Sequence, residues 1–400
     1  MSAGSVTPVE TRTAPTVTAA QAVGFRVAAH NLDERLPEGW LVEATTLFPI
    51  QDTAPPAGAG LGLAARIEDL VPAELERALF VERSLLRLHS VRGVPHVAAR
   101  PDGVVFGPGS LGADEDSLRD QLLGDWLAVQ AAGWTAHEAL AAVTGVFAAT
   151  LADGEPRTAS ELSGALHGYL PTALEPWCQA CQSNHVPHQL FRLAGAAGAF
   201  CYGRPVRGEP GLVSLDAWLG APLGGSVDSA RVELARRFLA AYGPATPEHF
   251  AAWAGVGVRD ARDRFARLQL ETVEVDLEGR PAWIREADVP LLDDPPPATG
   301  VRLLPADDPF LAQRDRATLL PDPAHQAQVW EPAVRPGVVL SGGRPVATWR
   351  SSIEQRTLVV AVLPLAGRGI DVPTRRALDE EAAALGVFFM CEDARADIAS

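Results

Sequence analysis

The residues of this chain best suited to chemistry come directly after a proline that interrupts an apolar run. Gln51, Asp52 and Thr53 follow Pro49 and precede a stretch rich in Pro, Gly and Ala. A glutamine side chain can orient a water molecule because it donates and accepts hydrogen bonds at once. A carboxylate can accept a proton or stabilise a cation. We therefore expect Gln51 and Asp52 to form a catalytic pair suited to C–N glycosidic cleavage, with helix capping by Asp52 or Thr53 as the alternative.

A second group of polar residues is basic. Residues 81–100 carry four arginines against one acid, Glu82, for a local net charge of +3 in a chain whose net charge is −16. Alternation along a strand places Arg83 and Arg87 on one face, where they can meet a phosphate backbone. The alternative is a solvated hairpin with a structural histidine. The residues expected to contact DNA in this segment are Arg83, Arg87, Arg92 and His96.

Two further groups have structural explanations that we favour. Four potential zinc ligands have the spacing C-x2-C-x3-H-x2-H, whose histidine pair is closer than zinc sites usually have. They are Cys178, Cys181, His185 and His188. We expect no metal there. The helix expected at 258–269 carries four arginines, but residues 229–292 hold 9 Arg and 10 acids. This balance argues against a helix that reads the DNA groove and favours a scaffold.

Length and composition restrict the class of protein. With 400 residues the chain exceeds one core, and its hydrophobic fraction of 47% is ample for folded domains. We expect no transmembrane helix and no signal peptide, because no apolar run is long enough. Four cysteines are too few for a disulfide scaffold, which fits a cytoplasmic protein. The net charge of −16 excludes a large nonspecific nucleic-acid surface but not a local basic strip.

Helices followed by two strands recur three times along the chain, which is the order of a winged helix. In the first unit, helices at 18–36, 40–48, 57–68 and 72–82 precede strands at 84–89 and 96–99. In the second, helices at 117–133, 136–151, 158–168 and 187–198 precede a hairpin at 202–213. In the third, helices at 229–242, 247–254 and 258–269 precede strands at 271–277 and 282–285, with Thr246 as a helix cap.

The expected secondary structure changes from mostly helices to mostly strands after a proline-rich segment. Strands are expected at 301–304, 337–340, 345–350 and 357–363, with a Gly342-Gly343 turn, and a helix at 373–385. We therefore predict an α+β fold of three tandem winged-helix domains followed by a β-rich C-terminal domain. The predicted boundaries are a frayed tail at 1–17, winged helices at 18–113, 114–225 and 226–293, a linker at 294–300, and the β-rich domain at 301–400.

Segments spread through the chain resemble a known family. They are FPIQD at 48–52, LAARIEDL at 63–70, SVRGVPHV at 90–97, WCQACQSNHVPHQLFRLA at 177–194, RRFLAAYGPATPEHFAAWAGV at 236–256, LLPADDPFLAQRDRATLLPD at 303–322 and GVVLSGGRPVATWR at 337–350. From about residue 18 to 390 the chain resembles the winged-helix proteins of the helix-turn-helix 42 type. These include the alkylpurine and interstrand-crosslink DNA glycosylases.

The resemblance implies a concave channel for double-stranded DNA and chemistry without a metal or other cofactor. It also implies catalysis by a Gln-apolar-Gln or Gln-apolar-Asp motif in the first winged helix. The matching segment here is Pro49-Ile50-Gln51, in which a proline replaces the first glutamine. The matching C-terminal segments add Arg314, Arg316 and Arg350 to the residues expected to contact DNA. We expect a monomer.

These observations predict a metal-independent, DNA-glycosylase-like hydrolase that acts on alkylated or bulky purine adducts. One alternative is a DNA-binding protein without catalytic activity, such as a lesion sensor or a regulator. Another is a family member repurposed to bind or transform a small molecule, which the acidity and the missing glutamine would explain. The surface potential of the central channel discriminates between them, because a positive channel is compatible with DNA and an acidic channel would exclude both DNA hypotheses.

Overall fold

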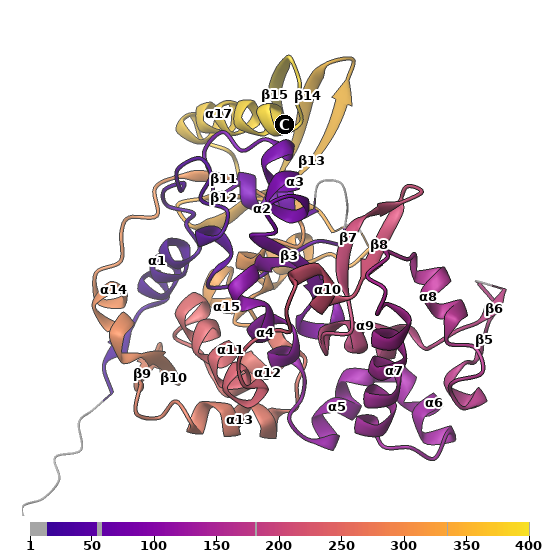
Figure 1. Cartoon of the computed structure of the whole chain (residues 1–400). Coiled ribbons are helices and arrows are strands. Elements are labelled where there is room, and N and C mark those ends of the chain that lie inside the picture. Colours follow the sequence, from indigo (N-terminus) through magenta and orange to yellow (C-terminus); the bar gives the residue numbers. More distant parts are fainter. Residues whose placement is uncertain (1–13, 54–57, 181, 334, 400) are drawn as a thin grey trace, which may run out of the picture.

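Three groups of helices are each followed by an antiparallel hairpin, and a larger mixed sheet comes last (Figure 1). The computed structural model describes residues 14–53, 58–180, 182–333 and 335–399. This arrangement confirms the mixed α+β class predicted from the sequence. In the described part of the chain, none of the helices combines the length and the apolar character that a membrane crossing requires.

The first group surrounds a three-stranded sheet of order β2-β4-β3. Its elements are β2 (Ile50–Gln51), α2 (Gly58–Ala64), α3 (Pro72–Phe80), β3 (Leu85–His89) and β4 (Pro95–Ala99), with α4 (Gly103–Phe106) after them. The helix predicted at 40–48 is wrong, because this segment holds only a 3-10 turn at Glu43–Thr45. Pro49 then lacks the N–H that a continuing helix needs, and β2 pairs with β4 instead.

The second group is mostly helical and has a hydrophobic core of its own. Its elements are α5 (Glu115–Leu122), α6 (Trp126–Ala131), α7 (Ala136–Thr150), α8 (Ala159–Ala165), β5 (Trp177–Cys178), β6 (Ser183–Asn184), α9 (His188–Ala196), β7 (Cys201–Val206), β8 (Glu209–Val213) and α10 (Leu215–Leu219). The single helix predicted at 117–133 is two helices in the structure. Leu123 has a φ of 52°, so the backbone leaves the helical region between α5 and α6.

The third group includes the start of the described chain. Its elements are α11 (Val227–Tyr242), α12 (Pro247–Ala254), α13 (Val258–Ala266), β9 (Thr272–Leu277), β10 (Arg280–Arg285) and α14 (Val289–Asp293), joined by β1 (Thr16–Val17) and α1 (Ala19–Ala29). Thr246 caps α12 as predicted. Because β1 pairs with β9, the prediction of a frayed tail up to residue 17 is wrong for Thr16 and Val17. Helix α1 buries Ala22 and Phe25 against the β9–β10 hairpin.

The C-terminal part is a five-stranded sheet of order β11-β12-β13-β14-β15. Its elements are β11 (Val301–Leu304), α15 (Arg316–Leu319), α16 (Pro323–Val329), β12 (Gly337–Ser341), β13 (Arg344–Glu354), β14 (Thr357–Pro364), α17 (Val372–Phe388) and β15 (Asp393–Ile398). The predicted turn at Gly342-Gly343 joins β12 and β13. Strand β15 has no counterpart in the sequence prediction, because its residues are mostly charged or small. Parallel pairing with β14 stabilises it.

A buried ion pair joins the first group to the C-terminal part. Arg66, just after α2, donates from Nη1 and Nη2 to the two carboxylate oxygens of Asp308, at 2.7 Å each. Both side chains are 0% exposed. Nη1 also donates to the carbonyl of Gly62. This bidentate ion pair holds α2 against the segment around Asp308.

Glycines in α2 permit close packing of this helix against its neighbours. A Cβ at Gly60 would lie 2.4 Å from Cζ of Phe388 in α17, and a Cβ at Gly62 would lie 2.8 Å from Cγ2 of Ile50. The small residues of this stretch therefore let the helix approach both β2 and α17.

We expect Asp308→Ala to lower the free energy of unfolding by about 3–5 kcal/mol, because it leaves the Arg66 charge buried without its partner. Urea unfolding followed by circular dichroism measures the change. The matched control is Arg376→Ala, whose side chain is 86% exposed and pairs with Glu380 on the surface. It should change stability by less than about 1 kcal/mol. Similar losses in both variants would contradict a special role for the buried pair.

Candidate active site

Strand β2 places Gln51 beside a pocket between the first group and the C-terminal part. Ile50 pairs with Val97 of β4, and Gln51 pairs with His96. Neighbouring residues of a strand point to opposite faces. Both residues line the pocket, but Ile50 is almost fully buried in the core, whereas Gln51 is half-buried.

The pocket has a volume of about 350 Å³. Side chains from distant parts of the sequence meet in it. Its polar lining consists of Gln51, Thr53, Asp307, Asp308, Arg335, Arg350 and Ser351. Trp349 and Leu61 contribute apolar surface. Such a mixture suits a site that orients a polar reactant beside a flat or apolar one.

Hydrogen bonds connect Gln51 with Asp307. Nε2 of Gln51 donates to Oγ1 of Thr53 at 3.2 Å, and the Thr53 hydroxyl donates to Oδ2 of Asp307 at 2.8 Å. Arg335 forms an ion pair with the same carboxylate. Asp307 is therefore a carboxylate of this site that the sequence analysis does not identify. Its segment matches the family pattern, but nothing in the sequence shows that it meets Thr53.

The orientation of the Gln51 amide follows from its neighbours. Nη2 of Arg92 lies 3.5 Å from Oε1 of Gln51. An exchanged amide would turn its N–H groups towards the guanidinium, and two donors would then face each other. In the favoured orientation, Gln51 keeps one N–H and one oxygen lone pair for a further partner. A water molecule can use both.

Arg92 connects this site with the third group. Its φ of 59° lies in the left-handed region, which residues with a side chain seldom adopt. Nη1 donates to the carbonyl of Trp253 in α12. Burial lowers the pKa of Arg92 to about 10, so the side chain stays cationic at neutral pH. Arg92 thus lies between Gln51 and Trp253, and the phosphate contact expected from the sequence stays a prediction.

Asp52 has contacts that differ from those of Gln51. Its Oδ1 accepts a hydrogen bond from the N–H of Ala59 at the start of α2, at 3.0 Å. Its Oδ2 lies 2.5 Å from Nε of Arg87, and the two side chains are 13% and 14% exposed. Both carboxylate oxygens are therefore occupied. The structure favours the capping alternative for Asp52 over the catalytic role expected from the sequence.

Two further arginines expected to bind DNA are held by aromatic side chains. Arg83 donates to the carbonyl of Trp218 at 2.7 Å, and its Cζ lies 4.0 Å from the centre of the Trp218 ring. Cζ of Arg87 lies 4.4 Å from the centre of the Tyr202 ring. These contacts tie the first group to the second and leave both guanidinium groups half-buried.

The predicted arginines of the C-terminal part have different positions relative to the pocket. Arg350 is exposed and lines it. Arg316 lies over Trp330, with Cζ 4.6 Å from the ring centre. Burial lowers the pKa values of Arg314 and Arg316, and neither side chain lines the pocket.

The lining of the Gln51 pocket carries no excess of acid in spite of the acidic chain. Among the described residues that line the pocket, the acids are Asp307 and Asp308, the arginines are Arg335 and Arg350, and each acid pairs with an arginine. A lining dominated by acids, which would argue against DNA, is not observed among these residues.

One of the described potential zinc ligands has an ordinary hydrogen-bond partner. Nδ1 of His185 hydrogen bonds to the carbonyl of Val186 at 2.7 Å. The described residues contain no group of three or more side chains that could hold a metal ion. Cys181 lies outside the described residues, so the absence of a metal stays a prediction.

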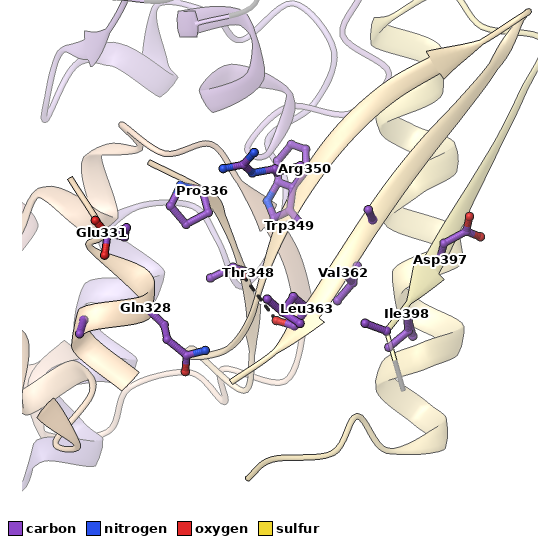
Figure 2. Close-up of a pocket in the computed structure, with 13 residues that line it drawn as sticks. Gln328, Glu331, Pro336, Thr348, Trp349, Arg350, Val362, Leu363, Asp397 and Ile398 are labelled. Carbon is purple, nitrogen blue, oxygen red and sulfur yellow. Dashed lines mark hydrogen bonds between the residues drawn. The ribbon is translucent and has the colours of Figure 1, made fainter. Parts of the chain in front are cut away.

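A larger pocket of about 750 Å³ adjoins the site on the C-terminal sheet (Figure 2). Thr348, Val362, Leu363 and Ile398 project into it from three strands, and Gln328 faces it from α16. Trp349 and Arg350 line both pockets, so the two are neighbours. Its surface is mostly apolar, and Gln51 does not line it. We therefore place the candidate chemistry at Gln51.

Comparison with known proteins assigns the chain to a family. A sequence profile described as "DNA glycosylase AlkZ-like" matches residues 33–388. The chain belongs to the AlkZ-like DNA glycosylase family. An interstrand DNA cross-link repair glycosylase of Streptomyces sahachiroi is 34% identical over 178 residues, which cover 42% of this chain and 46% of that relative. The match thus spans less than half of the relative's length.

A solved structure shares the fold of this AlkZ-like chain. It is the Streptomyces sahachiroi DNA glycosylase AlkZ, with a TM-score of 0.78 and 23% sequence identity. The similarity covers 96% of this chain and all of that one (100%). At this identity the likeness concerns the fold alone.

Pro49 stands where the family resemblance implies the first catalytic glutamine. Its side chain is buried and does not line the pocket. Thr53 lies beyond the end of β2, follows Gln51 by two residues and accepts a hydrogen bond from it. Gln51 therefore has a polar partner in the pocket, although this partner is a threonine and Asp52 lies between the two.

His96 supports the site from within the core. It is 3% exposed, and its Nδ1 hydrogen bonds to the carbonyl of Val94 at 2.9 Å. The direct DNA contact expected for it is therefore wrong, because the ring does not reach the surface. Burial lowers the pKa values of His96 and His89 to about 3, so both are neutral at physiological pH.

These histidines predict a pH dependence of stability. Their pKa values are lower in the folded chain than the usual 6.5, so the unfolded chain binds more protons and stability falls as pH drops below 6.5. Between pH 7.5 and 5.5 each should remove about 1 kcal/mol. Urea unfolding at the two pH values should therefore show a smaller loss for His96→Gln than for wild type.

The control for this prediction is His167→Gln, because the His167 side chain is 79% exposed. It should keep the wild-type pH dependence. An unchanged pH dependence in His96→Gln would show that burial of His96 does not hold its pKa down.

Proposed function

We propose that this AlkZ-like protein hydrolyses the N-glycosidic bond of alkylated or bulky purine adducts in double-stranded DNA. The observation that carries the proposal is the hydrogen-bonded series of Gln51, Thr53 and Asp307 in a pocket whose acids are paired with arginines. Alkylation of a purine ring nitrogen gives the base a positive charge and makes it a better leaving group. The enzyme must then position a water molecule and stabilise the positive charge that develops on the sugar.

The side chains have separate roles in this proposal. Gln51 and Thr53 hold the water molecule, since each can donate and accept a hydrogen bond. Asp307 takes the role first expected of Asp52. Its charge stabilises the oxocarbenium-like sugar, and it can receive the water proton through Thr53. Asp52 fixes the backbone beside Gln51 through its contacts with α2 and Arg87. No step requires a metal or another cofactor.

The scaffold of the proposal is the one predicted from the sequence. The three groups of helices with their hairpins act as winged helices, and the C-terminal part acts as a β-rich domain, in a monomer. The backbone of double-stranded DNA contacts Arg350 at the pocket, and Arg314 and Arg316 of the same C-terminal part. Arg335 is added because it lies in the same lining.

A second candidate is a DNA-binding protein without hydrolytic activity. The observation that favours it is Pro49, which removes one glutamine of the motif implied by the family resemblance. The small-molecule alternative has less support, because the acids that line the pocket are paired and leave no excess of acid in the lining.

We expect Gln51→Ala to slow the release of base from an N7-alkylated DNA duplex by about 100-fold, because the water loses its main orienting group. Thr53→Val and Asp307→Asn should each slow it by about tenfold or more. Asp52→Asn should act mainly on stability. Single-turnover assays with excess protein measure the rate of base release.

The matched control is Gln355→Ala, which changes an exposed glutamine in the turn between β13 and β14. It should release base at the wild-type rate. Equal, slow release by wild type and Gln51→Ala would end the catalytic proposal. The non-catalytic candidate would then be supported if both still bind the duplex.

DNA binding is tested separately with Arg350→Ala. Loss of one phosphate contact should weaken binding to duplexes of any sequence and reduce the slope of log K against log salt by about 1. Fluorescence anisotropy between 50 and 200 mM salt, chosen as roughly the range over which such contacts are screened, measures both. Arg119→Ala on α5 is the control and should leave the slope unchanged. An unchanged slope in Arg350→Ala would contradict a phosphate contact at this position.

A further inference from the structure

A third pocket, of about 460 Å³, lies in the second group between α8, the start of α9 and β7. Its volume lies within the range of about 300–1,000 Å³ that is usual for small-ligand sites. Rings form much of its wall. They belong to His89, His185, His188, Phe191 and Tyr202. Flat walls of this kind favour a flat ligand.

The rings are held in place by contacts among themselves. The hydroxyl of Tyr202 lies 3.1 Å from Nε2 of His89. His185 and His188 have ring centres 4.9 Å apart, and Phe191 packs against Phe200 at 5.1 Å. The wall is therefore formed before any ligand arrives, which lowers the entropy cost of binding.

Polar groups complete the pocket. Oγ of Ser163 is buried and has no hydrogen-bond partner among the described residues. Burial of a hydroxyl without a hydrogen-bond partner costs free energy. A ligand that offers a donor or an acceptor would remove this cost. Arg192 also lines the pocket and is exposed, so it can contact an anion at the edge. The lining thus combines stacking surfaces, a free hydroxyl and one accessible cation.

Two contacts place this pocket next to the candidate active site. Tyr202 lies under Arg87, and Arg87 pairs with Asp52, the neighbour of Gln51. On the other side, Gln189 of α9 donates to the carbonyl of Arg92 at 3.2 Å. The ring-lined pocket and the Gln51 pocket are therefore separated by only a few side chains.

We propose that the ring-lined pocket binds a planar aromatic group carried by the DNA substrate, while Arg192 contacts a flanking phosphate. The inference rests on the proposed function, because it assigns a second subsite to the same substrate. Stacking against aromatic side chains accepts any planar ring and does not depend on base sequence. Two sources supply such a ring: a nucleobase displaced from the duplex, or the aromatic part of a bulky adduct.

The test measures binding in the Gln51→Ala background, so that substrate stays intact. The first arm compares a fully paired duplex with one that carries a single unpaired 2-aminopurine, whose fluorescence falls on stacking. The second arm compares N7-methylguanine with guanine that carries an aryl-bearing N7 adduct. Ser160→Trp fills the pocket from an exposed position, and His188→Ala removes one ring. Ala165→Trp, exposed on the same helix but outside the pocket, is the control.

We expect about a tenfold preference in one arm, as stacking of a single ring would give. Ser160→Trp and His188→Ala should abolish it, and Ala165→Trp should keep it. A preference in the first arm identifies the displaced base, and one in the second identifies the adduct. Equal preference in all variants, or no preference in either arm while DNA is still bound, overturns the inference alone. Absence of any DNA binding overturns the proposed function together with it.

Discussion

The buried pair of Arg66 and Asp308 is the interaction on which the candidate site depends most. It joins a helix of the first group to a turn some 242 residues further along the chain, with both charges fully removed from water. Such a pair is costly unless its geometry is nearly ideal, so it tolerates little displacement. Asp307, the residue next to it, is thereby brought to the hydroxyl of Thr53. The pair therefore determines which carboxylate faces Gln51.

The site is assembled from three parts of the chain that share no local signal. Strand β2 carries Gln51, the C-terminal part supplies Asp307, and Arg92 reaches α12 of the third group. Thr53 contacts the amide nitrogen of Gln51, and Arg92 contacts its amide oxygen. A site built in this way is preorganised, because its polar groups are already aligned before a substrate binds.

The charge distribution resolves an apparent conflict between an acidic chain and a DNA-directed family. Net charge describes the whole surface, whereas binding depends on the field at the site. The two acids that line the Gln51 pocket are each paired with an arginine. Other arginines of the chain lie over aromatic rings, among them Arg83, Arg87 and Arg316. Stacking limits the freedom of these long side chains and keeps their charge in a defined direction.

Local patterns in the sequence were sufficient for most helices, hairpins and caps. Thr246 caps α12 through contacts within one turn, and the Gly342-Gly343 turn needs no distant partner. The sequence did not predict the elements that form by pairing with residues far away in the chain. The sequence of residues 40–48 is typical of a helix, but the residues that follow pair with β4 in a sheet. The segment of β15 forms a strand because it pairs with β14.

The same division applies to the candidate site. The sequence alone singled out Gln51, because an amide beside a proline break is unusual whatever surrounds it, and it indicated the family and the basic character of the hairpin. Only the tertiary structure decided that Asp52 is a helix cap, that His96 is buried and that Asp307 is the carboxylate beside Thr53. The physical reason is that residue type determines what a side chain can do. Which partners it finds depends on contacts across hundreds of residues, and these leave no local periodicity to read.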